Sequence, residues 1–470
     1  MASKPHVVIF PFMAQGHTIP MLDLSKALSF RGLKITIITT PSNSSFVISY
    51  VSQSLNNNIH LREIPFPHAH QLPKGCENTS HLLSPDQLLP FLAATKQLRP
   101  PFEQALRDMS KLPDPPCCVI SDTFLGWTNG SCRAFGIPRL VFHGMGVFAM
   151  AVKKSLSIHQ NHNKCLMKSS SDTEHVDVTG LMQLRFPLTT ADLPDSLRQM
   201  DSCLSEFFVE AEKSDLGSWG VIVNSFIELE KDHVAPLECL YGNESTRAWC
   251  VGPLFLYDDQ MEGGRNYHEE EIDSFLKLHE QEEKSVIYVA FGSQADLSDT
   301  QLDELAYGLE QSRENYIWVV RSKTWDPPIK GRGLITKNWV EQKRVLGHRA
   351  IGGFLSHCGW NSVLESLSMG VPILAWPMQN EQHLNAKFLV EEVKAALRVP
   401  TVGRERKVVR REVICEAVKE LMGGRRGKKA REKAIELGKL AKRAVQVGGS
   451  SYKCLDELIH QLPLGNAIHH

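Results

Sequence analysis

The sequence predicts an α/β protein with two parallel-sheet domains. Strand and helix patterns alternate from the first residues, a stretch of weak periodicity interrupts them near the middle, and the alternation then restarts. The 470 residues are too many for one ordinary core and fit two domains of about 200 residues each. We expect domains at 1–250 and 273–450, a linker at 251–272, and a terminal helix at 451–470 that packs back on the first domain.

The first half opens with a βαβ unit. Residues 6–12 form an apolar β run, residues 18–32 have apolar positions at helical spacing, and residues 34–40 are rich in β-branched side chains. The pattern recurs with expected strands at 117–123, 138–144 and 220–226 and a helix at 126–136. Residues 160–185 are polar and weakly periodic, so we interpret them as a surface excursion.

The second half repeats this rhythm. A strand with a glycine turn is expected at 285–293, and an amphipathic helix follows at 299–312, capped by Ser298 or Asp299. Further strands are expected at 316–320, 333–336, 351–356 and 371–377, and the tail from 408 to 462 is helical, with a basic run that we interpret as a solvated face. Two such halves imply two Rossmann-like domains facing across a cleft, with ligands beyond the carboxyl ends of the strands.

Composition excludes several classes of protein. The net charge of -1 gives no bulk field that would recruit nucleic acid or an anionic membrane, and no apolar run is long enough to span a membrane. The N-terminus lacks the apolar region of a signal peptide, and none of the eleven cysteines forms a C-x-x-C pair. We expect a cytoplasmic enzyme, monomeric, with reduced thiols.

The stretch 354–366, "FLSHCGWNSVLES", has the pattern of a strand end, a turn and a helix start. Asn361 and Ser362 fall where free backbone N–H groups and the helix dipole favour an anion, and Glu365 suits a ribose diol one turn later. A plain helix cap is the alternative. The adjacent His357 and Cys358 have no second pair at zinc-ligand spacing, so we expect a small buried thiol rather than a metal ligand. A second anion turn, Gly292 and Ser293, follows the first strand of the second domain.

A candidate acid–base pair lies in the first half. His17 follows the first strand, where a neutral imidazole could take a proton from a hydroxyl group. Asp122 ends a mid-sheet strand on the same side and could orient that imidazole. A capping or buried histidine and an aspartate N-cap are the alternatives.

Residues 338–388 resemble the signature box of plant family 1 UDP-sugar glycosyltransferases. The box runs from Trp339 to Gln382, its full 44 residues, and matches at many fixed positions. The resemblance extends to "QGH" after the first strand, "SD" after a later one, "VGPL" at the linker and "SVIYVAFGS" beyond it. It implies a GT-B fold, with the acceptor on the N-terminal side and the UDP-sugar on the C-terminal side.

The resemblance also implies roles for individual residues. Trp339 would stack on the uracil, with Gln342 framing the base, and Glu365 would bind the ribose; Val340 and Gly359 also belong to the expected UDP-sugar site. The diphosphate contacts would be Ser293, His357, Asn361 and Ser362, and the sugar contacts Trp360, Glu381 and Gln382. The box departs from the usual W-A-P-Q opening, because Val340 and Glu341 replace Ala and Pro. The segment between residues 321 and 339 is also shorter than the family pattern, because the usual "LPEGF"-like piece is missing.

The implied reaction is direct displacement on an α-linked UDP-sugar to give a β-glycoside. Helix-end N–H groups and His357 would stabilise the leaving diphosphate, and the chain has no Asp-x-Asp motif, so we expect no metal cofactor. Gln382 resembles the closing residue of glucose-using members, although His383 follows and galactose users tend to close with His.

The acceptor is expected to be a small apolar molecule with a hydroxyl group. A flavonoid or other phenolic is favoured; a triterpenoid, an existing glycoside or a different UDP-sugar is the alternative. Residues that could line its pocket are Phe12, Met13, Phe124, Trp127, Phe148 and Met150. Two other functions are alternatives. A nucleotide-linked oxidoreductase would need the pattern G-x-G-x-x-G after the first strand, but residues 11–17 contain one glycine. A non-catalytic UDP-sugar sensor would need neither His17 nor Asp122, and both are present.

Overall fold

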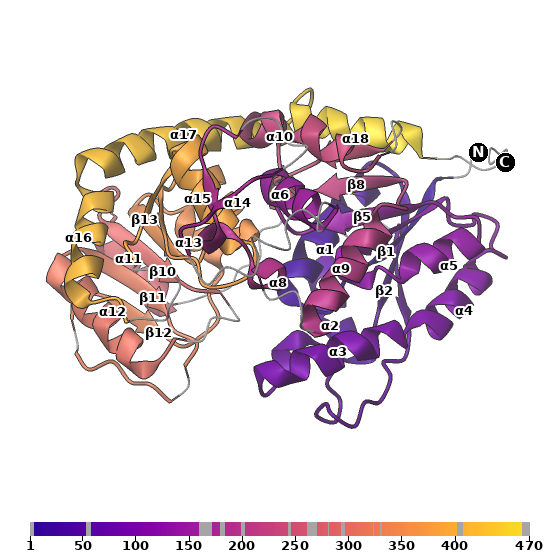
Figure 1. Cartoon of the computed structure of the whole chain (residues 1–470), viewed down its shortest axis with the longest axis horizontal. Helices are drawn as coiled ribbons and strands as arrows, with labels where there is room; N and C mark the ends of the chain where they lie inside the picture. Colours follow the sequence, from indigo (N-terminus) through magenta and orange to yellow (C-terminus); the bar gives the residue numbers. More distant parts are fainter. Residues whose placement is uncertain are drawn as a thin grey trace. The chain divides into compact units, whose positions relative to one another are not determined.

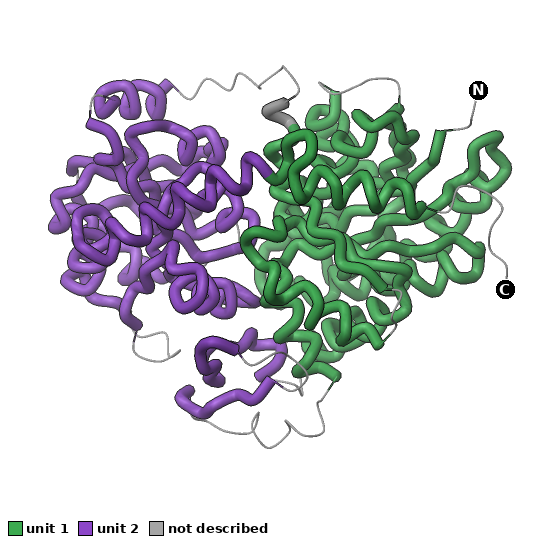
Figure 2. The backbone as a smooth tube through the Cα atoms, turned by 90° about the horizontal axis from the view of Figure 1, so that it is seen from above, with its two compact units in different colours: residues 1–158, 199–264, 444–470 green, residues 159–198, 265–443 purple. Residues whose placement is uncertain are grey.

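Two compact units make up the part of the chain that can be described. The computed structural model describes residues 4–52, 58–158, 172–178, 184–198, 203–242, 246–260, 270–280, 282–292, 297–322, 324–329, 331–401 and 408–462. Unit 1 contains residues 1–158, 199–264 and 444–470, and unit 2 contains residues 159–198 and 265–443 (Figure 2).

Unit 1 contains a seven-stranded parallel sheet with the order β3-β2-β1-β4-β5-β8-β9 (Figure 1). Its strands are β1 (His6–Phe10), β2 (Lys34–Thr39), β3 (Ile59–Glu63), β4 (Cys118–Asp122), β5 (Arg139–His143), β8 (Gly220–Val223) and β9 (Arg247–Cys250). The central strands are buried along their whole length, which explains their unbroken apolar runs. β1 pairs with β4 in register Phe10↔Ser121, so both strands end at the same edge.

The helices of unit 1 connect these strands. They are α1 (Gln15–Phe30), α2 (Pro41–Val51), α3 (Leu88–Lys96), α4 (Arg99–Met109), α5 (Thr128–Ala134), α6 (Val147–Ile158), α9 (Cys203–Asp215), α10 (Ile227–Cys239) and α18 (Ser450–Gln461). Short 3-10 segments η2 (Thr79–His81), η3 (Pro85–Gln87), η4 (Thr123–Leu125) and η7 (Leu254–Gln260) lie between them. α18 packs against β9.

Unit 2 contains a six-stranded parallel sheet with the order β12-β11-β10-β13-β14-β15. Alternate residues of β10 enter different cores. Ile287 and Val289 pack with α12 (Asp299–Ser312) and α16 (Arg411–Met422), whereas Val286 and Tyr288 pack with α11 (Glu270–Leu278) and α13 (Gln342–Leu346). The strands are β10 (Val286–Ala290), β11 (Asn315–Val319), β12 (Leu334–Thr336), β13 (Ile351–Ser356), β14 (Ile373–Ala375) and β15 (Ala396–Arg398).

The helices of unit 2 cover both faces of this sheet. They are α8 (Asp195–Arg198), α11 (Glu270–Leu278), α12 (Asp299–Ser312), α13 (Gln342–Leu346), α14 (Trp360–Ser368), α15 (Gln382–Phe388), η8 (Leu389–Val393, a π-helix), α16 (Arg411–Met422) and α17 (Arg425–Val445), whose last residues reach unit 1. Ser298 caps α12 through its hydroxyl group, one of the two caps expected there.

Residues 159–198 join unit 2 although they lie between two segments of unit 1. Their described parts contain the two-stranded antiparallel sheet β6 (His175–Val176) and β7 (Leu188–Thr189) and the turn η6 (Thr190–Asp192). Asp192 is buried and forms ion pairs with Lys387 of α15 and Arg398 of β15. The sequence placed this segment within residues 1–250, because its partners lie about 200 residues further along the chain.

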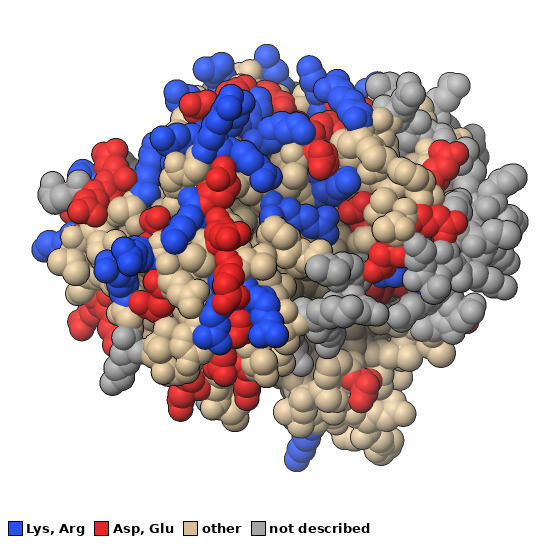
Figure 3. Space-filling view, turned by 60° about the vertical axis from the view of Figure 1, so that its left-hand side comes forward, with Lys and Arg blue, Asp and Glu red and all other residues tan. Residues whose placement is uncertain are grey.

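The surface carries both signs of charge. On the face shown in Figure 3, Lys and Arg side chains gather over the upper part, and a row of Asp and Glu side chains runs down beside them. Among the described residues, no helix is long and apolar enough to cross a membrane.

Candidate functional site

The edge of the unit 1 sheet brings His17 and Asp122 together. His17 lies in the first turn of α1, directly after β1, and Asp122 is the last residue of β4. The His17 Nδ1 atom lies 2.8 Å from Asp122 Oδ2, and the other carboxylate oxygen accepts the backbone N–H of Phe124 at 2.9 Å. An ionised carboxylate only accepts, so Nδ1 donates, which leaves Nε2 as the nitrogen that can take a proton. The Asp122 side chain is fully buried, while that of His17 is 25% exposed.

Aromatic rings surround this imidazole. Phe12 and Phe124 lie 5.3 Å and 4.7 Å from the His17 ring, measured between centroids. Met13 and Trp127 belong to the same apolar cluster. Phe148 and Met150 do not: both are buried on α6, where Phe148 packs on His233 of α10. The structure therefore brings four of the six expected pocket residues together.

Further phenylalanines of this cluster were not singled out from the sequence. Phe91 of α3 contacts Phe12, and Phe208 of α9 contacts Phe124 with 5.3 Å between ring centroids. Phe207 and Phe66 extend the cluster. The adjacent Phe207 and Phe208 within an amphipathic pattern were the available signal, but neither α3 nor α9 was predicted.

The turn after β13 leads into the start of α14, where the sequence predicts an anion site. Cys358 has a left-handed backbone conformation with φ of 66°, and Gly359 is the N-cap of α14. The Cys358 N–H donates to Ser356 Oγ at 3.1 Å, and Asn385 donates to the Cys358 carbonyl at 2.9 Å. Burial raises the pKa of the Cys358 thiol to about 12, so this residue shapes the turn without reacting. Asn361 and Ser362 follow in the first turn of α14.

The His357 imidazole lies between two glycines. A Cβ atom on Gly359 would lie 2.5 Å from His357 Nε2, and one on Gly292 would lie 2.7 Å away. Burial lowers the pKa of His357 to about 4, against a smaller rise from the backbone of Ala290. The imidazole is therefore neutral at pH 7 and can meet a phosphate oxygen as an N–H donor rather than as a cation.

Three polar side chains form one network beside this turn. The Gln342 amide nitrogen donates to Glu365 Oε2 at 2.7 Å and to Ser362 Oγ at 2.9 Å. Residues expected to hold base, ribose and phosphate are thus linked before any ligand arrives. Gln342 opens α13, and Ser362 and Glu365 lie on α14.

The segment before α13 presents an indole. The Trp339 side chain is 49% exposed, whereas Val340 is buried in the core behind α13. Glu341 stands at the N-cap of α13 and pairs with Lys343 at 3.8 Å. Val340 and Glu341, which replace the usual Ala and Pro of the box, therefore serve as a core residue and as the N-cap of α13.

Gln382 has a fixed orientation at the start of α15. Its carbonyl oxygen accepts the backbone N–H groups of Met378 and Gln379, both at 3.0 Å. Because the oxygen is held by the turn, the NH₂ group is the end left for hydrogen-bonding a ligand. Glu381, half-buried, is the N-cap of the same helix. Trp360, expected to face the sugar, is 2% exposed, so its indole ring is buried at the start of α14.

Comparison with known proteins identifies the family. The family model "Glycosyltransferase, N-terminal domain" matches residues 4–256, and "UDP-glucoronosyl and UDP-glucosyl transferase" matches residues 263–443. UDP-glycosyltransferase 90A1 of Arabidopsis thaliana is 39% identical, over 97% of this chain and 96% of that protein. The chain belongs to the plant UDP-glycosyltransferases. Their GT-B fold is the fold described above.

Two other relatives of this glycosyltransferase have informative names. The scopoletin glucosyltransferase of Nicotiana tabacum is 36% identical, with 99% of each chain covered. The structure of Glycyrrhiza uralensis UGT73P12 complexed with glycyrrhetinic acid 3-O-monoglucuronide matches with a TM-score of 0.84 and 29% identity, covering 98% of this chain and 96% of that one.

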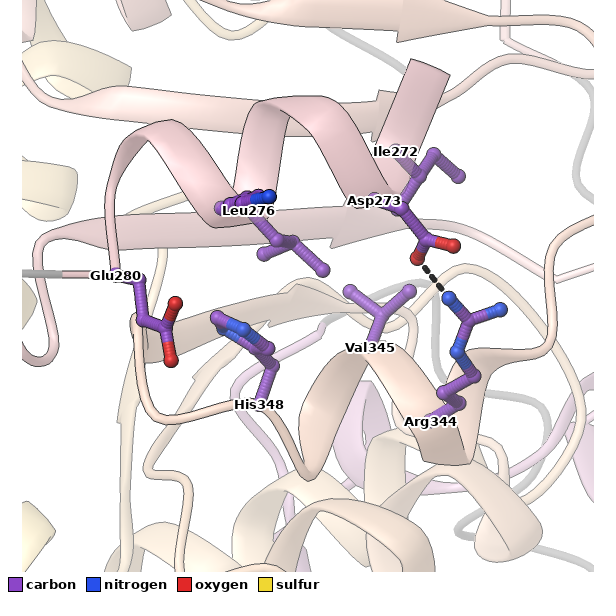
Figure 4. Close-up of a pocket in the computed structure, with 8 residues that line it drawn as sticks. Ile272, Asp273, Leu276, Glu280, Arg344, Val345 and His348 are labelled. Atoms are coloured by element: carbon purple, nitrogen blue, oxygen red, sulfur yellow. Dashed lines mark hydrogen bonds and ion pairs between the residues drawn. The ribbon is translucent and has the colours of Figure 1, made fainter. Parts of the chain in front are cut away.

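One pocket of the glycosyltransferase lies between α11 and α13 (Figure 4). It has a volume of about 100 Å³, small beside the roughly 300 Å³ or more of a ligand pocket, and none of the expected donor residues lines it. Arg344 of α13 pairs with Asp273 of α11 across this pocket, and the ion pair links the two helices. Its lining residues are Ile272, Asp273, Leu276, Lys277, Glu280, Arg344, Val345 and His348.

Two expectations about the glycosyltransferase site, the phosphate contact of Ser293 and the absence of a metal cofactor, remain predictions. Ser293 lies outside the described residues, so its place in the phosphate site is not seen. Within the described ranges, no group of three or more His, Cys, Asp or Glu side chains could hold a metal ion.

Proposed function

We propose that this glycosyltransferase transfers glucose from UDP-glucose to a hydroxyl group of a small apolar plant metabolite, with a flavonoid or other phenolic favoured. The reaction inverts the anomeric centre and gives a β-glucoside. The 2.8 Å contact between His17 Nδ1 and Asp122 Oδ2 carries this proposal, because it orients a base for a hydroxyl acceptor.

The acceptor loses its proton to His17. Nε2 takes the proton as the acceptor oxygen attacks the anomeric carbon, and Asp122 stabilises the imidazolium that forms. The bond between that carbon and the diphosphate breaks from the opposite side, so an α-linked sugar becomes β-linked.

The diphosphate leaves with more negative charge than it had as an ester. The free N–H groups at the start of α14 and the neutral His357 supply hydrogen bonds to that charge, and they are positioned before the reaction begins. This arrangement supports a mechanism without a metal ion. We expect activity to be unchanged by EDTA; loss of activity that Mg²⁺ or Mn²⁺ restores would contradict the metal-free mechanism.

UDP-glucose is the donor that the residues favour. Gln382 presents its NH₂ group from a held orientation, which suits acceptance by a sugar hydroxyl, and a relative at 36% identity is named a glucosyltransferase. Rings at 5.3 Å and 4.7 Å from His17 give the base an apolar surround that suits a flat phenolic such as scopoletin, which that relative is named for. The Glycyrrhiza structure with glycyrrhetinic acid 3-O-monoglucuronide keeps a triterpenoid or glycoside acceptor as the alternative.

A monomeric cytoplasmic enzyme fits this role. The cysteines of the described residues are all free, as a reducing compartment requires. Light scattering of the purified protein tests the monomer, and localisation of a fluorescent fusion tests the compartment.

Mutation of His17 tests the function. His17→Ala should abolish transfer to hydroxyl acceptors while UDP binding, measured by titration calorimetry, stays at the wild-type value. A panel of UDP-sugars against phenolic and triterpenoid acceptors, analysed by mass spectrometry, identifies the donor and the acceptor class. Wild-type transfer by His17→Ala would remove the base assignment. UDP-sugar binding without transfer to any acceptor would favour the sensor.

A further inference from the structure

A group of buried charges lies directly beneath the His17–Asp122 pair in unit 1. Arg139 and Asp215 have fully buried side chains, and that of Lys154 is 2% exposed. Lys154 Nζ lies 3.2 Å from Glu212 Oε2 and 4.4 Å from the centre of the Tyr241 ring. None of these residues is used in the proposed reaction, and none was singled out from the sequence.

Arg139 holds the strand that ends in Asp122. Its Nε donates to Ser121 Oγ at 2.7 Å, and one terminal nitrogen donates to the Asp122 backbone carbonyl at 3.3 Å. The other terminal nitrogen donates to Ser218 Oγ at 2.9 Å and lies 3.5 Å from Asp215 Oδ1. One guanidinium therefore joins the end of β4 to the chain that follows α9.

Asp215 holds the residue on the other side of Asp122. Its Oδ2 accepts the Thr123 hydroxyl at 3.1 Å and the His143 Nε2–H at 2.6 Å. Asp215 is the last residue of α9, and the preceding Ser214 donates to the Gly126 carbonyl. The turn η4, which begins right after Asp122, is thus tied to the end of α9.

The neighbouring cations favour the ionised form of the two carboxylates in this cluster. Burial alone would raise the pKa of Asp215, but His143, Lys154 and Arg139 outweigh it and lower that pKa. Glu212 behaves in the same way, because Lys154 and Lys153 outweigh its burial. Stability is a weak reason to keep such a cluster, since well-packed apolar side chains of similar volume are often as stable.

We propose that Asp215 and Arg139 are positioning residues, which fix the Asp122 carboxylate against His17 by holding Ser121, Thr123 and the Asp122 backbone. The proposal rests on the proposed function, in which His17 is the base. Asp122 makes two contacts with its carboxylate, to His17 and to the Phe124 N–H, and both depend on the direction of the chain at η4.

The hydrogen bonds between the end of α9 and the η4 turn also position part of the aromatic cluster. Phe207 and Phe208 lie about two turns before Asp215 on α9, and both contact Phe124. Anchoring the end of α9 to η4 therefore keeps these rings in a fixed position relative to the base. Loss of the anchor should disturb acceptor binding as well as proton transfer.

Thr123→Val is the mildest test, because it removes one hydroxyl group without removing a buried charge. We expect kcat to fall about tenfold, as for loss of one hydrogen bond, with KM for UDP-glucose unchanged. A carboxylate beside an imidazole raises its pKa, so a misplaced Asp122 should lower that of His17. The acid limb of the kcat/KM profile should then move to lower pH.

Two further variants complete the test. Thr123→Ser should restore both kcat and the acid limb. Thr36→Val is the matched control: it removes another buried threonine hydroxyl of unit 1, which bonds His6 at 2.8 Å, and should leave both unchanged. Asp215→Asn should move the acid limb in the same direction as Thr123→Val, with circular dichroism verifying the fold.

Wild-type kcat and an unmoved acid limb in Thr123→Val would overturn the positioning role. An equal shift in Thr36→Val would also overturn it, because the effect would then be general destabilisation. His17→Ala separates the two proposals: if it abolishes transfer while Thr123→Val behaves as wild type, the base assignment stands and the positioning role alone fails.

Discussion

The space for the His357 imidazole depends on two glycines, Gly292 and Gly359, because a Cβ atom on either would contact the ring. Gly359→Ala would place a Cβ atom 2.5 Å from His357 Nε2, closer than real Cβ contacts allow, so the imidazole must move. We expect UDP to bind at least tenfold more weakly by calorimetry, with unit 2 still folded. Gly423→Ala is the control, because its Cβ would meet its nearest atom, the Lys419 carbonyl oxygen, at 3.8 Å. Equal UDP affinity in the two variants would refute the tight fit.

The same histidine makes stability depend on pH. Its pKa is about 4 in the folded chain and about 6.5 when unfolded, so the unfolded state binds more protons between these values. The stabilising contribution is complete above pH 6.5 and is lost as the pH falls toward 4. Relative to His357→Gln, the wild type should lose about 3 kcal/mol of unfolding free energy between pH 7 and 4 in urea titrations. A difference that stays constant with pH would contradict the shifted pKa.

At the scale of elements, η6 supports the helix that begins with Gln382. Asp192 lies 3.4 Å from the Arg398 guanidinium and 3.9 Å from Lys387 Nζ, and it also accepts the Thr189 N–H and hydroxyl. Asp192→Asn removes the charge between two cations, so α15 should be held less firmly. We expect KM for UDP-glucose to rise several-fold in steady-state kinetics, while KM for the acceptor is unchanged.

Asp172→Asn provides the matched control for that prediction. Asp172 belongs to the same chain segment and pairs with Arg198 at 2.8 Å, so its loss should leave KM for UDP-glucose at the wild-type value. Equal effects of the two variants would mean that the whole segment, rather than its tie to α15, sets donor binding.

At the scale of the whole molecule, the core of unit 1 is completed by α18, about 200 residues after β9. In α18, Leu455 and Leu458 are buried, Asp456 pairs with Arg31 at 2.9 Å, and the Ser451 hydroxyl donates to the Gly252 carbonyl. Removing residues 446–470 should cost unit 1 about 4 kcal/mol or more, judged from the two leucines alone. Calorimetry should show an early unfolding transition, with Lys453→Ala, an exposed change in α18, as the control. A single unshifted transition would refute this.

The sequence predicted the parts of the molecule that depend on local pattern. Strands such as 351–356 and the helix 299–312 were placed correctly, because their apolar spacing is strong and both faces of each sheet are covered. The turn at 357–362 was found because residue types at a helix start carry the chemistry. The expected roles of these residues stay predictions, since geometry alone does not test them.

Long-range contacts were beyond the sequence. Residues 159–198 belong to unit 2, where Asp192 pairs with cations about 200 residues away, and the proposed support under Asp122 uses Asp215, a buried charge in an unpredicted helix. Phe148 was expected in one pocket with Phe12, whereas the structure packs it on His233 of α10. The side of a helix that faces a neighbour depends on that neighbour, and the sequence alone did not identify α10 as the partner of α6.

The order of the segments has a consequence for synthesis on the ribosome. Unit 1 begins the chain but needs residues 444–470, whereas unit 2 has all its residues once position 443 has emerged. Unit 1, which starts first, is therefore completed after unit 2, and the apolar surface that α18 covers stays uncovered until that helix has been synthesised. A nascent chain halted before α18 would leave the surface under Leu455 and Leu458 exposed, so this helix is what completes the core of unit 1.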